Sequence, residues 1–232
     1  MNLTEIKKGQ VGTGLLVEND GFISLSDNRN KMLRESLSST TDWNVPNPFI
    51  VSAVFQKYGI ENANGRIYPE HVLKREVERY MSLVKDNRSY GELNHPESSS
   101  VDLGRVALNI IELNWEGHTL VGKVMIPVSH GFRTLGIITC CADMLAHHIL
   151  SGLKVGVSSR GLGSVTKMGT QLIVSDDYEI VCWDAVSTPS TPNAWIEKDY
   201  DKLTPYLESE DKSKKPIIRE DKYTKYEKWL FS

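Results

Sequence analysis

The chain has 232 residues, of which 40% are apolar and 25% are charged, and its formal net charge is −3. This composition is typical of a globular protein and excludes a wholly disordered or fibrous chain. The basic excess of a nucleic-acid-binding protein is absent, and the apolar runs fall far short of the roughly 20 residues that a membrane-spanning helix needs. The odd count of 3 cysteines, two of them adjacent, indicates reduced thiols in a cytosolic compartment.

The two ends of the chain differ from its middle. Residues 1–45 are polar and rich in turn-forming residues, which is typical of a flexible N-terminal arm. Half of residues 197–232 are charged, so residues 198–232 are predicted to form a flexible charged tail.

Between the two ends, the sequence predicts several strands and two helices, at residues 69–84 and 134–150, where apolar side chains recur at helical spacing. Most of the strands follow one another directly along the chain. This order favours an antiparallel β-barrel or sandwich with helices outside it over a doubly wound parallel sheet. The predicted strands are residues 49–55, 106–113, 119–126, 154–159, 170–175 and 178–187.

His95 is the first residue suited to catalysis. It follows Asn94 and precedes Pro96 in a predicted loop. A loop histidine can act as a general base near neutral pH, because its ordinary pKa lies close to that pH. It can equally be a surface residue that bonds to a turn.

Ser158 and Ser159 form a second candidate site at the end of a predicted apolar strand, followed by Arg160 and Gly161. A serine here could be a nucleophile. The glycine would let backbone N–H groups approach a developing oxyanion, and the arginine could stabilise that charge or hold an acidic substrate group. A strand that simply ends in a Ser/Gly-rich turn explains the same residues.

Asp184 is the third candidate, because it lies inside an otherwise apolar predicted strand. A buried carboxylate is costly unless it is paired. Asp184 could orient a histidine as the third member of a catalytic triad, or form an ion pair with a basic residue such as Arg160.

Two further pairs, Cys140–Cys141 and His147–His148, lie on the second predicted helix. Their spacing does not match that of a zinc site, and the chain has no glycine-rich phosphate-binding motif. These four residues are therefore interpreted as core and helix-surface residues, and we expect neither a metal nor a cofactor.

The candidate motifs occur in a characteristic order: Asn-Gly-Arg-Ile-Tyr-Pro at 64–69, Gly-Glu-Leu-Asn-His-Pro at 91–96, Gly-Val-Ser-Ser-Arg-Gly-Leu-Gly-Ser at 156–164 and Asp-Ala-Val at 184–186. This order resembles that of the prohead core proteases of contractile-tailed phages, which are similar to the herpesvirus maturation protease, assemblin. The resemblance covers roughly residues 49–197. It implies an α+β fold, a mainly antiparallel herpesvirus-protease-like β-barrel with surrounding helices, and a single protease domain at residues 46–197.

The resemblance also implies an activity and its setting. The protein would be a serine endopeptidase that works inside the viral prohead, in the host cytoplasm, during capsid maturation. Its substrates would be the phage scaffold and core proteins, internal proteins, the major capsid protein and the protease itself. It would need no cofactor or metal, would form a homo-oligomer, and would bind neither nucleic acid nor membrane.

The same resemblance assigns roles to the candidate residues. His95 matches the catalytic histidine, and the motif favours Ser158 as nucleophile, with Ser159 as the alternative because strand alternation alone does not choose between them. Asp184 would take the place that a second histidine has in assemblin. Backbone N–H groups around Arg160 and Gly161 would bind the oxyanion or the substrate.

Cleavage after glutamate, with Leu or Ile two residues before it, is a further implication. Self-cleavage is therefore expected in the arm and after Glu220, whereas the same pattern at Ile110-Ile111-Glu112 lies in a predicted strand and should be protected. The matching segments in the arm and tail are Leu3-Thr4-Glu5, Leu16-Val17-Glu18, Leu33-Arg34-Glu35 and Ile218-Arg219-Glu220.

Two other functions are compatible with the sequence. A catalytically inactive relative could serve as a scaffold or assembly protein inside the capsid, and a hydrolase of small esters would use the same catalytic residues. The first differs from a protease by the loss of processing activity, and the second by a deep substrate pocket.

Overall fold

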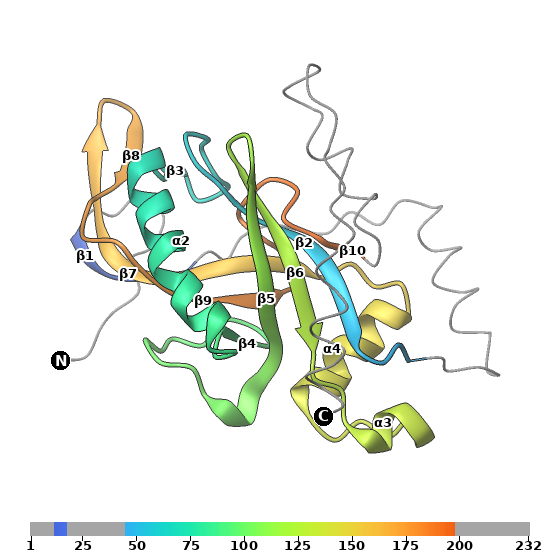
Figure 1. The fold of residues 1–232 in the computed structure, drawn as a ribbon. Coiled ribbons are helices and arrows are strands. Elements are labelled where there is room, and N and C mark those ends of the chain that lie inside the picture. Colours follow the sequence, from blue (N-terminus) through green and yellow to red (C-terminus); the bar gives the residue numbers. More distant parts are fainter. Residues whose placement is uncertain (1–11, 18–44, 198–232) are drawn as a thin grey trace.

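The computed structural model describes residues 12–17 and 45–197, and within these ranges the strands form two five-stranded sheets (Figure 1). The first sheet contains β1 (Gly12–Val17), β3 (Arg66–Ile67), β7 (Gly156–Met168), β8 (Gln171–Val174) and β9 (Glu179–Val186). The second contains β2 (Phe49–Lys57), β4 (Tyr90–Glu92), β5 (Val106–Glu116), β6 (Thr119–Ile126) and β10 (Ile196–Glu197). The helices are α2 (Glu70–Lys85), α3 (His130–Leu135) and α4 (Cys141–Leu150).

The predicted α+β class is confirmed, because all the strand pairs except β3–β8 are antiparallel in the described part of the chain. The predicted closed barrel is not confirmed. Two separate sheets are present, and isolated bridges join them, Leu93 to Ala185 at one edge and Gly156 to Trp195 at the other. Backbone pairing between the sheets is therefore limited to these short segments, while their side chains pack together in one core.

Trp183 on β9 lies at the centre of the core. Its fully buried ring makes edge contacts with Tyr80 of α2 and Phe55 of β2, at centroid distances of 4.9 and 5.7 Å. Aromatic pairs in this geometry contribute about 0.5–1.5 kcal/mol each beyond their buried area. These contacts fix one face of β9, so the side chains that alternate with Trp183 lie on the opposite face.

Helix α2 matches the predicted helix and packs against β5 and β9 (Figure 1). Its buried Glu76 accepts a hydrogen bond from the Ile180 backbone N–H at 3.0 Å. Arg75 and Arg79 donate to the carbonyls of Tyr178 and Ile180 at 2.9 and 2.6 Å. Side chains of α2 thus satisfy the backbone at the start of β9, where another strand would otherwise be needed.

The single helix predicted at residues 134–150 is wrong, because the structure has α3 and α4 with a break between them. Gly136 ends α3 in the left-handed conformation with φ of 69°, which glycine adopts without steric cost. The carboxylate of Asp143 then accepts hydrogen bonds from Thr139 in the break and from Ser129 at the start of α3. The apolar spacing continues through the break, which is why periodicity alone missed it.

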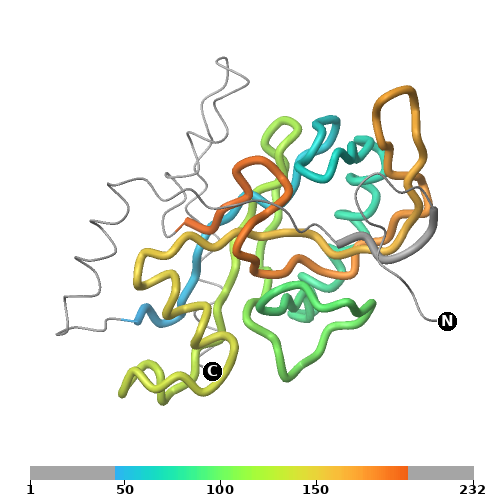
Figure 2. Tube along the Cα trace, turned by 180° about the vertical axis from the view of Figure 1, so that it is seen from behind, coloured from blue at the N-terminus to red at the C-terminus, as the bar shows by residue number. Residues whose placement is uncertain are grey.

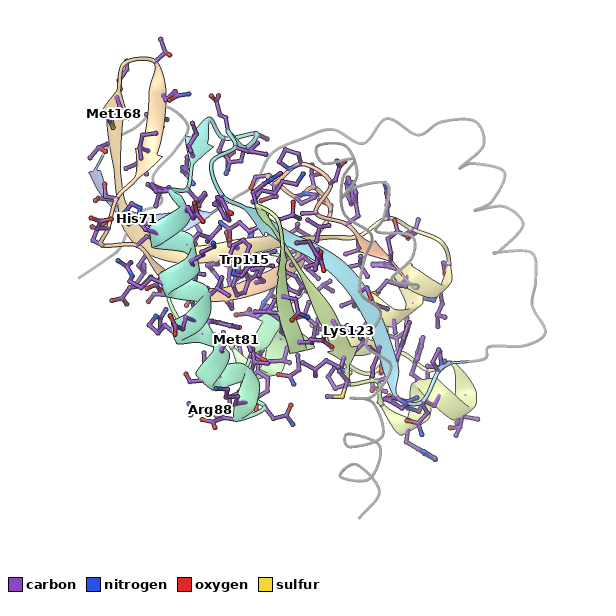
Figure 3. The ribbon with its side chains drawn as sticks, turned by 45° about the horizontal axis from the view of Figure 1, so that its top comes forward. His71, Met81, Arg88, Trp115, Lys123 and Met168 are labelled. Carbon is purple, nitrogen blue, oxygen red and sulfur yellow. The ribbon has the colours of Figure 1, made fainter. Side chains whose placement is uncertain are left out.

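The prediction that the strand at 154–159 ends in a glycine-rich turn is also wrong, because β7 continues to Met168 at the tip of the β7–β8 hairpin (Figure 3). Gly161 and Gly163 are needed within the strand because Tyr178 packs directly on them. A Cβ atom on Gly161 would lie 2.5 Å from the Tyr178 ring, and one on Gly163 would lie 2.9 Å from the Tyr178 Cα. The glycines therefore provide close packing, not a turn.

Six residues of the predicted N-terminal arm form β1, which pairs with β7. The predicted cleavage segments that end at Glu5, Glu35 and Glu220, the glutamate of the segment that ends at Glu18, and the charged tail lie outside the described residues. No helix in residues 12–17 and 45–197 has both the length and the apolar character needed to cross a bilayer.

Candidate active site

The segment after β4 lies beside β9, and this contact places His95 next to Asp184. Leu93 bridges to Ala185, and the Asn94 N–H donates to the Ala185 carbonyl at 2.8 Å. Asn94 has a φ of 66°, a left-handed conformation that asparagine tolerates better than most residues. Gly91 is required for the approach, because a Cβ there would lie 2.0 Å from the Trp183 carbonyl oxygen.

His95 and Asp184 form a buried pair. The His95 Nδ1 lies 2.7 Å from Asp184 Oδ2, and both side chains are 0% exposed. With Nδ1–H donating to the carboxylate, a neutral imidazole has its lone pair on Nε2. This Nε2 is buried and has no hydrogen-bond partner among the described residues.

Arg160 contacts the same carboxylate, that of Asp184. Its Nε donates to Asp184 Oδ2 at 2.9 Å and its Nη2 to Glu92 Oε1 at 2.8 Å. Its Nη1 donates to the carbonyls of Ser98 and Ser100 at 2.9 and 3.1 Å. Because the guanidinium is 0% exposed and every nitrogen is engaged, it faces this network and not a substrate. The two alternatives for Asp184, histidine partner and ion pair with Arg160, therefore hold at the same time.

Glu92 is a buried member of the site that the sequence analysis missed. Its Oε1 binds Arg160 and the Asp102 N–H, at 2.8 and 3.0 Å, and its Oε2 accepts from Arg105 Nε at 3.1 Å. Its own N–H donates to Asp184 Oδ1 at 2.8 Å. The motif that contains His95 includes this glutamate, but no pattern in the sequence marks its side chain as buried, and charged residues are almost never fully buried unless they are paired.

The charges of the network keep Asp184 ionised. Burial alone would raise the pKa of Asp184, but the hydrogen bond and charge of His95, together with the Arg160 guanidinium, lower the pKa below its usual value. Cys182 also donates to Asp184 Oδ1, at 3.2 Å. Burial raises the pKa of the Cys182 thiol well above its usual value, so Cys182 remains a neutral donor and not a nucleophile.

β7 and β9 run side by side (Figure 2), and their register distinguishes the two serines. Ser158 is directly opposite Asp184, whereas Ser159 is opposite Trp183. Opposed residues in an antiparallel pair turn their side chains to the same face, so Ser158 shares the face of Asp184 and Arg160. Ser159 shares the core face of Trp183. Both serines are buried, with exposures of 1% and 4%.

Gly161 and Arg160 lie within a strand that has neighbours on both edges. Arg160 is opposite Cys182 of β9 and Val17 of β1, and Gly161 is opposite Ile180 and Leu16. Their backbone groups therefore belong to the two ladders in this structure. Among the other candidates, Cys140 and Cys141 lie at the start of α4, and His147 and His148 lie in its last turn. Within residues 12–17 and 45–197, no group of three His, Cys, Asp or Glu side chains could hold a metal ion.

A buried histidine–aspartate pair is one part of the Ser-His-Asp arrangement of serine hydrolases, in which the other ring nitrogen of the histidine bonds to the serine hydroxyl. That bond is absent here among the described residues, because His95 Nε2 has no hydrogen-bond partner. The family described as prohead core protein serine protease matches residues 24–203, and the chain belongs to this family. This membership confirms the resemblance and the enzyme class predicted from the motifs.

Two further comparisons support the assignment. The prohead core protein protease of Enterobacteria phage T4 is 35% identical over 150 residues, which cover 63% of this chain and 66% of the relative. The chain thus aligns with about two thirds of that protein. The solved structure of the bacteriophage T4 capsid assembly protease, gp21, superposes with a TM-score of 0.54 at 29% identity, covering 59% of this chain and 80% of that chain.

Proposed function

We propose that this chain is a serine endopeptidase that cleaves capsid-assembly proteins inside a phage prohead, in a host cytoplasm, with His95, Ser158 and Asp184 as its catalytic residues. The observation that carries the proposal is the 2.7 Å contact between His95 Nδ1 and Asp184 Oδ2, on the face of the sheet that Ser158 shares. The names of the relatives supply the setting. A herpesvirus-protease-like arrangement of the strands is part of the same proposal.

The geometry of the buried pair supports these roles. The Nδ1–H bond to Asp184 leaves Nε2 as the base, so His95 takes the hydroxyl proton as Ser158 attacks the scissile carbonyl. The imidazolium that forms is stabilised by the ionised Asp184 and then returns the proton to the leaving amine. Arg160 holds the carboxylate in place. We therefore propose it as a positioning residue and do not assign its guanidinium to the oxyanion.

The proposed substrates are the phage scaffold, internal and capsid proteins, cleaved after glutamate with Leu or Ile two residues earlier, and the chain itself in its arm and after Glu220. Consistent with protection of folded segments, Ile110-Ile111-Glu112 lies in β5, with Ile110 fully buried. Self-cleavage would be seen by mass spectrometry as new termini after these glutamates in an active preparation, and intact termini would contradict it.

The test is co-expression with the cognate scaffold protein and comparison of three alanine variants. His95→Ala and Ser158→Ala should abolish processing. Ser159→Ala should retain most of it, because that side chain faces the core with Trp183. Loss of processing with Ser159→Ala alone would move the nucleophile to Ser159. No processing by the wild-type chain would favour the alternative of an inactive scaffold protein.

A further inference from the structure

Four side chains at the candidate active site form a buried row, in the order Glu92, Arg160, Asp184 and His95. Arg160 lies between the two acids, with Nη2 at 2.8 Å from Glu92 Oε1 and Nε at 2.9 Å from Asp184 Oδ2. His95 Nδ1 lies 2.7 Å from the same oxygen of Asp184. All four side chains are 0% exposed, so water does little to screen their charges from one another.

The contacts of Glu92 are those of an ionised carboxylate. Besides Arg160, Oε1 accepts from the Asp102 N–H at 3.0 Å, and Oε2 accepts from Arg105 Nε at 3.1 Å. Every partner is a donor, which suits an acceptor-only carboxylate. Since Asp184 is also ionised, the buried row holds two anions and one cation while the imidazole is neutral.

The proposed reaction adds a proton to this row. When His95 takes the hydroxyl proton, the buried row changes from one net negative charge to none. Without Glu92, Arg160 would already cancel the charge of Asp184, and the imidazolium would leave the row with a net positive charge. Because an uncompensated charge in a protein interior is costly, Glu92 favours the imidazolium by offsetting the charge of Arg160.

The other ionisable groups near the row do not replace Glu92. Arg105 is 45% exposed, so solvent screens its charge. Asp102 is exposed, and its carboxylate accepts from the Gly104 N–H. Burial raises the pKa values of Tyr80 on α2 and Cys182 on β9 well above the ordinary ones, so both side chains stay neutral near neutral pH.

We propose that Glu92 is a positioning residue for the proposed reaction, which holds Arg160 against Asp184 and offsets the charge of Arg160 so that His95 can accept the proton of the nucleophile. This inference rests on the proposed protease function. Glu92 acts through its neighbours, because its side chain is buried and both oxygens already accept hydrogen bonds. Its loss should therefore lower kcat and leave KM nearly unchanged.

The experiment compares Glu92→Gln with the wild type in cleavage of a fluorogenic peptide of residues 214–224, which contains Ile218-Arg219-Glu220, over a range of pH. Glutamine keeps the size of the side chain and removes its charge. We expect kcat to fall about tenfold or more, with KM changed less than about threefold. The acidic limb of kcat/KM should move to lower pH by about one unit, because a lost negative charge disfavours protonation of both Asp184 and His95.

Glu76→Gln is the matched control. Glu76 is also buried and also accepts from two arginines, Arg75 and Arg79, and from a backbone N–H, that of Ile180. Asp184 lies four positions beyond Ile180 on β9, about 13 Å away along the strand. Both variants should unfold at lower denaturant concentration than the wild type, but only Glu92→Gln should shift the acidic limb. Equal shifts in the two variants would overturn the proposal.

A double variant, Arg160→Met with Glu92→Gln, tests the proposal even if Glu92→Gln does not fold, because removing both partners of a buried pair costs less than removing one. Its acidic limb should lie at least about half a unit below that of Arg160→Met alone. Equal limbs in these two proteins, or an unshifted limb in a folded Glu92→Gln, would contradict the role of Glu92 only. Absence of His95-dependent cleavage by the wild type would contradict the protease function itself.

Discussion

His95 and Arg160 bind the same oxygen of Asp184, with Nδ1 at 2.7 Å and Nε at 2.9 Å from Oδ2. The second oxygen is held by the Glu92 N–H at 2.8 Å. A carboxylate fixed from several directions can orient an imidazole without moving when the imidazole becomes charged. Arg160 also opposes protonation of Asp184, so the proton stays on the histidine during the proposed reaction.

Replacing Asp184 with asparagine should therefore abolish most activity while leaving substrate binding intact. The amide can donate to Nδ1 and favour the wrong tautomer, an effect that lowers kcat by about 10⁴-fold in a well-studied Ser-His-Asp protease. We expect a fall of about 10³–10⁴-fold in kcat for peptide cleavage, with KM changed less than about threefold.

An exposed histidine–aspartate pair at a similar distance provides the control for this prediction. His71 Nε2 lies 2.8 Å from Asp176 Oδ1, but these side chains are 71% and 76% exposed, and His71 lies on the outer side of α2 (Figure 3). Asp176→Asn should leave kcat within about twofold, since exposed pairs contribute little. Equal effects at both positions would contradict a special role for Asp184.

Removing Arg160 should shift the pH dependence of activity as well as weaken the fold. Without the guanidinium, the pKa of Asp184 rises, so the carboxylate protonates at higher pH and the acidic limb of kcat/KM moves to higher pH. Breaking a buried pair typically costs about 3–5 kcal/mol of stability. Arg160→Met should therefore also lower the unfolding midpoint in denaturant.

Arg105→Gln is the matched control for Arg160→Met, because Arg105 also bonds to Glu92 but is 45% exposed. Its loss should change stability by about 1 kcal/mol or less and leave the pH profile in place. The conservative variant Arg160→Lys should keep the pH profile close to that of the wild type, if charge is the main contribution. An unshifted acidic limb in Arg160→Met would show that the arginine is only structural.

The catalytic candidates could be predicted because the type of each residue differs from what its neighbours in the sequence lead one to expect. Asp184 lies among apolar residues, and His95 lies between Asn94 and Pro96 in a short loop. The β7–β9 register could not be predicted, because it depends on which strands pair, and a shift of one residue exchanges the faces of Ser158 and Ser159. Glu92 was missed because a three-residue strand is too short for its sequence pattern to indicate which side chains are buried.

The errors in the fold predicted from the sequence have a common physical origin. Glycines at 161 and 163 are usually turn signals, but here the tertiary contact with Tyr178 requires them within a strand. The break between α3 and α4 depends on Asp143, whose four hydrogen bonds to Ser129 and Thr139 form only when the two segments pack together. Local sequence patterns carry no information on such tertiary contacts. The amphipathic pattern of α2, by contrast, was sufficient to predict that helix.

Asp143 should make stability depend on pH in the acidic range. Burial alone would raise its pKa, but the hydrogen bonds from Ser129 and Thr139 lower the pKa to about 2, from an ordinary value of 3.8. Because the folded-state pKa is the lower one, the stabilisation is fully present above about pH 4 and is lost as the pH falls toward 2. It amounts to about 2 kcal/mol.

Urea unfolding of the wild type and Asp143→Asn between pH 2 and pH 7 would measure this contribution. The variant should be less stable at neutral pH, and the difference between the two proteins should shrink as the pH falls. A difference that stays constant over this range would mean that the carboxylate charge contributes nothing.

Adding a methyl group at Gly161 should destabilise the protein, although alanine is normally the better residue in regular structure. The new Cβ would lie 2.5 Å from the Tyr178 ring and 2.7 Å from the Glu179 carbonyl oxygen. Backbone on one side and a buried ring on the other leave little room to adjust, and overpacking of this kind costs about 1–3 kcal/mol.

Gly131→Ala in α3 is the control, since its Cβ would meet nothing closer than 4.0 Å. It should be neutral or stabilising by up to about 1 kcal/mol. Denaturation midpoints of the two variants decide the matter: equal midpoints would show that β7 can move away from Tyr178.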